Sequence, residues 1–377
     1  MEINLTIKKQ QKQQLLKNND SDILILVLIK MKIAFAFCSF KNGASPRQIN
    51  QAIQQKVQKL NIEAQYFQLS DGGENTAASL SNKSSSFKGW DALQRPIEYN
   101  IAFINDIPII EMAQTVGIEK LSKDELNPFV TTSYGFGEAT KQFLSYSDIY
   151  LTVGGSATVD FGFGFLKGLG CIFLDQNDNE VYFNVVKDII QIQKIIIPDN
   201  HPNITVLCDV KNMLTGETGA VRVFGPQKGL QSSDFEIFDK ISTHVKMIIN
   251  KEEQQGDGAA GGIVYVLRNL FNAKIVSGAE FVLEAQNFED KTQGYDILFT
   301  GEGQLDSQSS FGKACQVVCQ KFQGKKIGIF GQIKTNVDFL DAIFSCQKGI
   351  KSLDEALKTC SEDVSDVVYN IINVLLM

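Results

Sequence analysis

Short apolar runs, each followed by a polar or glycine-rich turn, recur along this chain. The first run is Ile33 to Phe37, and Asp148 to Val153, Asp296 to Thr300 and Lys326 to Phe330 repeat the pattern. Nearly unbroken apolar runs of this length are typical of strands that are covered on both faces. They predict an α/β fold with an open parallel or mixed sheet, in which ligands lie at the carboxyl ends of the strands.

A helix is expected after the first strand. Ser45 is a good N-cap, and Pro46 suits the first helical position. The apolar residues that follow recur at helical spacing and are Ile49, Ile53, Val57 and Leu60. The segments from Lys83 to Asp124 and from Asp175 to Asn203 are less regular and rich in Ile and Phe, and we interpret them as part of a second α/β lobe.

Residues 1–30 differ from the rest of the chain. The stretch from Lys8 to Lys17 is rich in Gln and Lys, which predicts a disordered extension. The apolar run Ile23 to Ile29 is far shorter than the roughly 20 residues that a membrane-spanning helix needs. A mitochondrial presequence is the alternative, but Glu2, Asp20 and the lack of arginine argue against it.

Composition narrows the possible functions. The 377 residues, 44% of them hydrophobic, provide material for about two domains. The net charge of −7 comes from scattered acidic residues, so nucleic acid is not an expected partner. The seven cysteines form no CxxC pair, which favours reduced thiols and a cytoplasmic location. His201 and His244 are the only histidines, and neither follows a nucleophile-type turn, so a hydrolase triad is disfavoured.

Lysine and carboxylates gather at two early strand ends. Lys41 directly follows the first strand, where it could meet an anionic ligand, although a solvated loop lysine is the alternative. Asp71 and Glu74 flank two adjacent glycines and offer hard oxygen atoms for magnesium or a substrate hydroxyl. An ordinary Asp-Gly turn is the alternative there.

A second group of small and polar residues lies further along the chain. Gly154 to Asp160 precedes an expected helix, whose free amides, with the hydroxyls of Ser156 and Thr158, would bind an anion such as phosphate. Close packing of strand and helix through glycine is the alternative. Asp209 follows a strand, and Phe224 to Gly229 forms a rigid basic turn; either feature could be only structural.

The last polar segment runs from Thr300 to Gln308 and leads to Gly312 and Lys313 at an expected helix start. It is not a Walker A loop, because Ser307 stands where the first glycine belongs and Ala314 follows the lysine. It nevertheless places two carboxylates, two glycines and a lysine at one strand end, a density that turn chemistry alone does not explain.

Taken together, these segments resemble the bacterial-type glycerate kinases. The matching segments, in order and with compatible spacing, are MKIAFAFCSFK, SDGGENT, NPFVTTSYGFGE, GGSATVD, CDV, FGPQKG, GDGAAGG and GEGQLDSQSSFGK. The resemblance implies two α/β domains, one of them a Rossmann- or flavodoxin-like lobe assembled from discontinuous segments, with the active-site cleft between the lobes. The expected division is residues 31–72 with 290–377 for the first lobe and residues 73–289 for the second.

The resemblance also implies a phosphotransferase that uses ATP and Mg²⁺ and acts on D-glycerate, usually giving 2-phosphoglycerate. A cytoplasmic monomer or homodimer without a membrane partner is expected. The catalytic candidates are Lys41, Asp71, Asp209 and Asp306, and the last two would also hold the metal. Candidates for nucleotide binding are Gly154, Gly155, Ser156, Thr158, Gly301, Glu302, Gly303, Gly312 and Lys313. Candidates for substrate binding are Ser39, Lys41, Gly72 and Gly73.

Several residues depart from the pattern of the family. Cys38 stands where an aspartate is usual, and a thiol cannot replace a carboxylate as a magnesium ligand. Val159 and Phe161 replace a polar residue and a glycine, and Asn75 replaces another glycine. The alternatives to an active kinase are therefore a catalytically weakened homologue that binds nucleotide or a sugar acid in a regulatory role, and an unrelated α/β nucleotide-binding enzyme.

Overall fold

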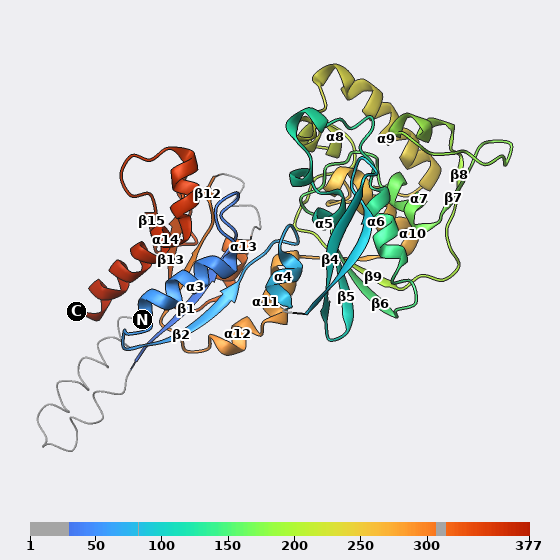
Figure 1. The fold of residues 1–377 in the computed structure, drawn as a ribbon. Coiled ribbons are helices and arrows are strands. Elements are labelled where there is room, and N and C mark those ends of the chain that lie inside the picture. The colour runs from blue at the N-terminus through green and yellow to red at the C-terminus, as the bar shows by residue number, and fades with distance from the viewer. Residues whose placement is uncertain (1–29, 82, 307–313) are drawn as a thin grey trace, which may run out of the picture.

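The computed structural model describes residues 30–81, 83–306 and 314–377, and in these ranges most strands belong to two sheets (Figure 1). The predicted extension, apart from Lys30, and Gly312 and Lys313 lie outside the described residues. The strands of the five-stranded sheet are, in spatial order, β15 (Ala342–Ser345), β13 (Lys325–Phe330), β11 (Ile297–Gly301), β1 (Met31–Phe37) and β2 (Ile62–Gln68). All four neighbouring pairs in this sheet are parallel.

Helices cover both faces of the five-stranded sheet. Ile33, Phe35 and Phe37 of β1 pack into one core, and Ala34 and Ala36 pack into another on the opposite face. The helices of the first core are α3 (Pro46–Val57) and α14 (Leu353–Leu376), and those of the second are α11 (Gly278–Ala285), α12 (Phe288–Lys291) and α13 (Ala314–Lys321). The prediction of a strand covered on both faces is confirmed.

The predicted helix after β1 is α3. Ser45 forms a capping box with Gln48, and Pro46 occupies the first turn. The helix ends at Val57, so Leu60 lies beyond it.

The second sheet has six strands and mixed pairing. In spatial order they are β10 (Lys274–Val276), β9 (Asn203–Leu207), β6 (Asp148–Thr152), β5 (Ile107–Glu111), β4 (Pro96–Ile104) and β3 (Ser84–Trp90). The first four are parallel to one another, whereas β4 is antiparallel to both of its neighbours. The segment from Lys83 to Asp124, which looked irregular in sequence, thus supplies three strands. β3 gave no apolar signal because it is a mostly exposed edge strand that begins with three serines.

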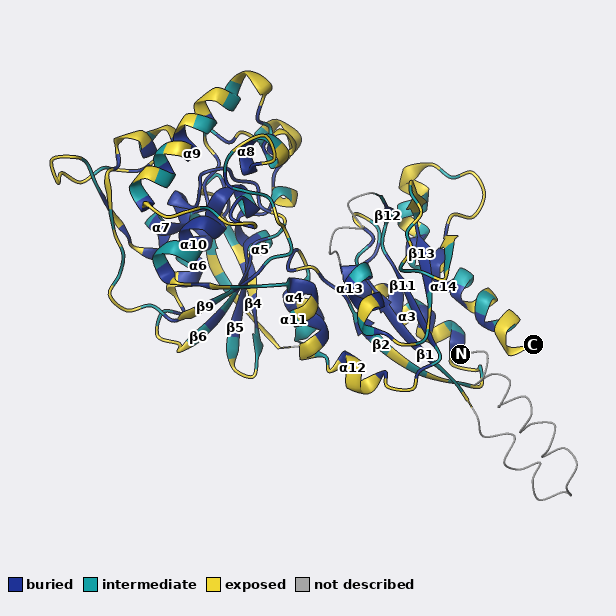
Figure 2. Ribbon diagram, turned by 180° about the vertical axis from the view of Figure 1, so that it is seen from behind, coloured by how far each residue is buried: buried dark blue, intermediate teal, exposed yellow. Residues whose placement is uncertain are grey.

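The remaining elements are shorter or cover the six-stranded sheet. The helices are α4 (Thr76–Leu80), α5 (Met112–Val116), α6 (Tyr134–Lys141), α7 (Phe163–Leu169), α8 (Ala220–Phe224), α9 (Phe235–Ile249) and α10 (Ile263–Phe271). The short strands are β7 (Ile172–Leu174), β8 (Lys194–Ile196), β12 (Gln304–Leu305) and β14 (Gln332–Ile333). Figure 2 shows that buried residues concentrate on the strands and on the helix faces turned toward them. Among the described residues, no helix has both the length and the apolar character needed to cross a membrane.

The two sheets are formed by different parts of the sequence. Every strand of the six-stranded sheet lies between β2 and β11 in the sequence. The exact lobe boundaries, residues 31–72 with 290–377 and residues 73–289, stay a proposal. Helix α11 and the first residues of α12 precede residue 290 but pack in the core of the five-stranded sheet through Ala279, Leu283 and Phe288.

Candidate functional site

A cavity of about 950 Å³ lies where the carboxyl ends of strands from both sheets meet. Cys38 and Glu302 line it just after β1 and β11 of the five-stranded sheet. Gly154 and Asp209 line it just after β6 and β9 of the six-stranded sheet. Its volume is at the upper end of the range for small-molecule sites, and strand ends are where ligands bind in open α/β sheets.

The structure brings most of the candidate residues together around this one cavity. Those that line it are Ser39, Lys41, Asp71, Gly72, Gly73, Gly154, Gly155, Ser156, Asp209, Glu302, Gly303 and Asp306. Thr158 and Gly301 do not line it: both are fully buried, Thr158 behind the turn and Gly301 as the last residue of β11.

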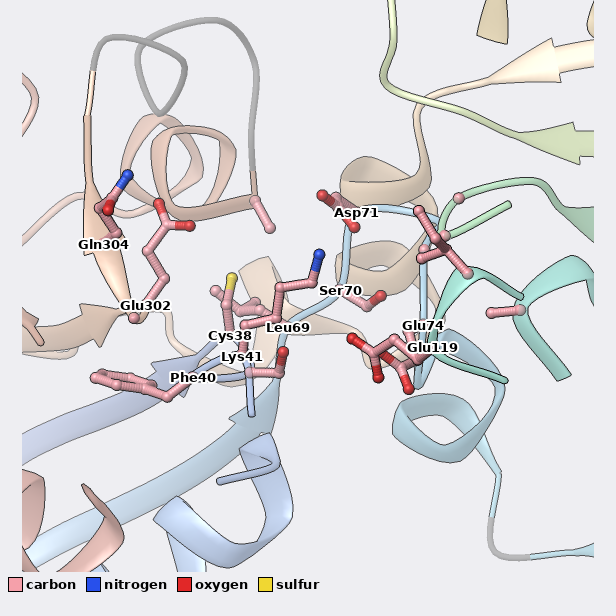
Figure 3. Close-up of a pocket in the computed structure, with 18 of the residues that line it drawn as sticks. Cys38, Phe40, Lys41, Leu69, Ser70, Asp71, Glu74, Glu119, Glu302 and Gln304 are labelled. Atoms are coloured by element: carbon pink, nitrogen blue, oxygen red, sulfur yellow. The ribbon is translucent and has the colours of Figure 1, made fainter. Parts of the chain in front are cut away.

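Lys41 occupies the loop between β1 and α3. The backbone closes this loop with a hydrogen bond of 2.9 Å from the N–H of Phe40 to the carbonyl of Ala44. In Figure 3, Lys41 lies between Glu302 on one side and Asp71 and Glu74 on the other. The ammonium group of Lys41 therefore lies among carboxyl groups from both sides of the cavity.

Asp71 and Asp209 form the acidic pair of the cavity. A carboxylate oxygen of Asp209 accepts a hydrogen bond of 2.9 Å from the N–H of Ala279, at the start of α11. Burial, helped by the nearby charge of Asp71, raises the pKa of Asp209 to about 6, while hydrogen bonds from Ser277 and from backbone amides act in the opposite direction. Two interacting carboxylates of this kind can accept a proton or bind a divalent cation.

Glu74 and Glu119 form a second carboxyl pair, which Figure 3 shows side by side. The pKa of Glu74 is raised, first by burial and then by the charge of Glu119 and the hydrogen bond between the two carboxyl groups. Glu119 was missed in the sequence because it follows α5 in a short connecting turn rather than a strand end. Behind the pair, Glu111 is only 2% exposed, accepts the N–H of Ala77 at 2.9 Å and has its pKa raised to about 7 by burial.

Cys38 places sulfur in the cavity wall. Its Sγ lies 3.7 Å from the Sγ of Cys315 at the start of α13. The hydrogen bond to Cys315, burial and the negative charges of Glu302 and Asp71 all raise the pKa of Cys38. The group is therefore a neutral thiol near pH 7, which is a poor ligand for a hard cation.

The turn from Gly154 to Asp160 differs from its prediction. Helix α7 begins only at Phe163, because Phe161 and Gly162 adopt left-handed backbone conformations with φ of 52° and 78°. The amides of the turn therefore do not lie at the N-terminus of a helix. Ser156 instead accepts a hydrogen bond of 2.7 Å from Nζ of Lys228, a residue of the basic turn to which the sequence assigned no role.

The acidic residues of the cavity include possible ligands for a metal ion. Among the residues that the structure describes, no group of three or more His, Cys, Asp or Glu side chains could hold a metal ion. Mg²⁺ is usually bound by one or two carboxylates together with substrate phosphates and water, and the pair Asp71 and Asp209 meets that requirement. Asp306 lies on the five-stranded side of the cavity, where Nε2 of Gln304 donates a hydrogen bond of 2.6 Å to it.

Comparisons with known proteins agree on one family. The model of the glycerate kinase family matches residues 33–376. A protein named Glycerate 2-kinase from Escherichia coli K12 is 32% identical over 370 residues, which cover 90% of this chain and 97% of that protein. A protein named Glycerate kinase from Bacillus subtilis 168 is 31% identical over 362 residues, or 88% and 94% of the two chains. A crystal structure assigned to glycerate kinase 2 from Salmonella typhimurium LT2 superposes with a TM-score of 0.78 at 30% identity, covering 92% of this chain and 98% of that one.

Proposed function

Because the chain belongs to the glycerate kinase family, we propose that it transfers the γ-phosphoryl group of ATP to a hydroxyl of D-glycerate. The 2-hydroxyl is the proposed acceptor, which gives 2-phosphoglycerate, since the relative from Escherichia coli carries the name Glycerate 2-kinase. The observation that carries the proposal is the cavity at the strand ends, which Lys41 lines together with Asp71, Asp209 and Asp306. We further propose a cytoplasmic monomer or homodimer.

Phosphoryl transfer depends on alignment and charge neutralisation more than on covalent catalysis. Lys41 would stabilise the negative charge on the phosphoryl group in transit, or hold the carboxylate of glycerate. Ser39, Gly72 and Gly73 line the same cavity and would contact the acceptor. The two glycines let the backbone approach it closely.

The acidic residues divide between two tasks. One of Asp71, Asp209 and Asp306 would accept the proton of the attacking hydroxyl, and the raised pKa of Asp209 suits that role. Asp71 and Asp209 would hold Mg²⁺, while Asp306, which the sequence also offered as a metal ligand, lies on the five-stranded side of the cavity. A bound Mg²⁺ would supply positive charge to the phosphate oxygens of ATP.

The nucleotide would lie against two glycine-containing segments. Gly154, Gly155 and Ser156 would contact its phosphates, with Thr158 supporting the turn from behind. The other segment comprises Glu302, Gly303, Gly312 and Lys313, with Gly301 buried before it at the end of β11. Release of ADP that requires both ATP and D-glycerate is the direct test, and a protein that releases ADP equally without glycerate would contradict the proposal.

A catalytically weakened homologue is the second candidate function, and the neutral thiol of Cys38 favours it. We expect Cys38→Asp to lower the Mg²⁺ concentration needed for half-maximal turnover, because it returns a hard oxygen ligand to the cavity wall. Cys38→Ser is the matched control, since it also replaces sulfur with oxygen but adds no charge.

Thermal unfolding and turnover separate the two candidate functions. A protein that ATP with Mg²⁺ stabilises against heat, but that releases no ADP with glycerate, would be the weakened homologue. Equal Mg²⁺ dependence in Cys38→Asp and Cys38→Ser would remove Cys38 as the reason.

A further inference from the structure

Lys228 is a lysine of the cavity wall to which the proposed transfer gives no role. It is only 2% exposed, yet it lines the cavity. Its Nζ donates hydrogen bonds to Oγ of Ser156 at 2.7 Å and to the carbonyl oxygen of Thr158 at 2.8 Å. An ammonium group has three N–H donors, and among the described residues only these two acceptors are within hydrogen-bond distance.

The turn that carries Lys228 is held firmly. Lys228 ends a short 3-10 helix of residues Pro226–Lys228, in which its own N–H donates to the carbonyl of Gly225 at 2.9 Å. Gly229 follows with φ of 95°, and a Cβ there would lie 2.0 Å from the carbonyl oxygen of Leu126. The backbone therefore fixes where the lysine enters the cavity wall.

No carboxylate in the described part of the chain forms an ion pair with Lys228. The negative charge that acts on it is that of Asp160, whose oxygens already accept the N–H groups of Ser133 at 2.7 Å, Gly162 at 3.2 Å and Gly164 at 3.1 Å. Burial lowers the pKa of Lys228 to about 7, and the charge of Asp160 only partly opposes this. A buried cation without a paired anion is costly, and an anionic ligand would relieve that cost.

Two backbone amides of the neighbouring turn already have acceptors within the protein. The N–H of Gly154 donates to the carbonyl of Gly72 at 3.3 Å, and the N–H of Ala157 donates to the carbonyl of Val116 at 2.9 Å. With α7 beginning only at Phe163, no helix N-terminus faces the cavity here. Backbone amides carry no net charge, so the formal positive charge in this part of the wall comes from Lys228.

We infer that Lys228 and Ser156 form a pocket for an anionic group of a substrate. The inference rests on the proposed function, which offers two such groups: a phosphate of ATP and the carboxylate of glycerate. In either case, the third N–H of Lys228 and the hydroxyl of Ser156 bind an oxygen of the anion. Ser156 can donate its own proton, because it accepts one from Lys228.

The test is calorimetric binding to the full chain and to Lys228→Met, which keeps most of the length of the side chain and removes the charge. The ligands are a non-hydrolysable ATP analogue with Mg²⁺ and its neutral counterpart adenosine, D-glycerate and its neutral amide D-glyceramide, and inorganic phosphate. The matched control is Lys167→Met, which removes another lysine that donates to a backbone carbonyl, that of Phe183, away from the cavity.

We expect Lys228→Met to lower the affinity for one charged ligand about 10- to 100-fold and to leave the affinity for its neutral counterpart unchanged. A loss of this size is expected for a hydrogen bond to a charged group. A loss for the ATP analogue identifies the phosphate as the bound group, and a loss for glycerate identifies the carboxylate. Lys167→Met should bind every ligand as the unchanged chain does. The inference would be overturned if Lys228→Met lowered the affinities for charged and neutral ligands equally, or if it left the affinities for the charged ligands unchanged.

The inference and the proposed function can fail separately. If the chain binds neither the ATP analogue nor glycerate, the proposed function is rejected. The binding of inorganic phosphate then tests the inference by itself. Phosphate binding that is lost in Lys228→Met and kept in Lys167→Met supports the pocket, and absent or retained binding rejects it. If Lys228→Met does not fold, Ser156→Ala replaces it, with a loss of about 3- to 10-fold expected for the same charged ligand; unchanged binding rejects the pocket.

Discussion

Lys41 stands among the acidic groups of the cavity, and the proposed transfer depends on its charge. We predict that Lys41→Met lowers kcat about 100- to 1,000-fold, the usual effect of removing one group that stabilises developing charge. The measurement is ADP release with ATP and D-glycerate. Lys32→Met is the control, because Lys32 lies on β1, the strand before this loop, but pairs with Glu63 at the surface. Undiminished turnover in both Lys41→Met and Asp306→Asn would remove the assignment of these residues.

Glu111 gives a prediction about stability rather than turnover. Burial raises the pKa of its carboxyl from 4.5 to about 7, so the folded chain holds this proton to a higher pH than the unfolded chain does. The free energy of unfolding therefore loses a contribution on the order of 3 kcal/mol as the pH rises from about 4.5 through 7. Glu111→Gln should abolish that loss, because the amide has no proton to release and keeps an oxygen for the N–H of Ala77.

Urea unfolding at pH 5 and pH 8 tests the Glu111 prediction. Glu98→Gln is the control, since Glu98 is an exposed residue of β4. If the unchanged chain and Glu111→Gln lost equal stability between the two pH values, Glu111 would not be the source of the pH dependence.

At the scale of elements, the two glycines around the end of β11, Gly301 and Gly303, differ in how closely they are packed. A Cβ at Gly301 would lie 1.8 Å from the carbonyl oxygen of Ile329, in the neighbouring strand β13, whereas a Cβ at Gly303 would have its nearest atom at 3.5 Å. We predict that Gly301→Ala destabilises the fold by on the order of 1–3 kcal/mol, because the sheet must widen there. Gly303→Ala should leave the free energy of unfolding nearly unchanged, and equal losses in the two variants would contradict this account.

The strands were predictable from the sequence where both faces are buried. The apolar runs correspond to β1, β6, β11 and β13, each within one or two residues of its predicted bounds. The pattern failed for β3, whose exposed edge position leaves it without an apolar run. It also failed at the turn after β6, because the left-handed backbone of Phe161 delays α7 and has no signature in the residue types.

At the scale of the whole molecule, the sequence identified the segments of the site but not their partners. Turns after β1, β6, β9 and β11 were recognisable because glycine, lysine and aspartate follow apolar runs. Glu119 was not, and Lys228 was recognised only as part of a basic turn without a role, since both lie on connecting turns whose closeness to the cavity depends on tertiary packing. Local residue types thus predict strand ends, whereas side chains that arrive from elsewhere become visible only in the folded chain.

The central claim is that this cavity transfers phosphate to glycerate. The most direct measurement is phosphorus NMR of the protein incubated with ATP, Mg²⁺ and D-glycerate, which resolves 2- from 3-phosphoglycerate. We predict a growing signal of 2-phosphoglycerate together with ADP, and neither signal from Lys41→Met on the same timescale. ATP that stays intact, or that breaks down without any phosphoglycerate, would contradict the account.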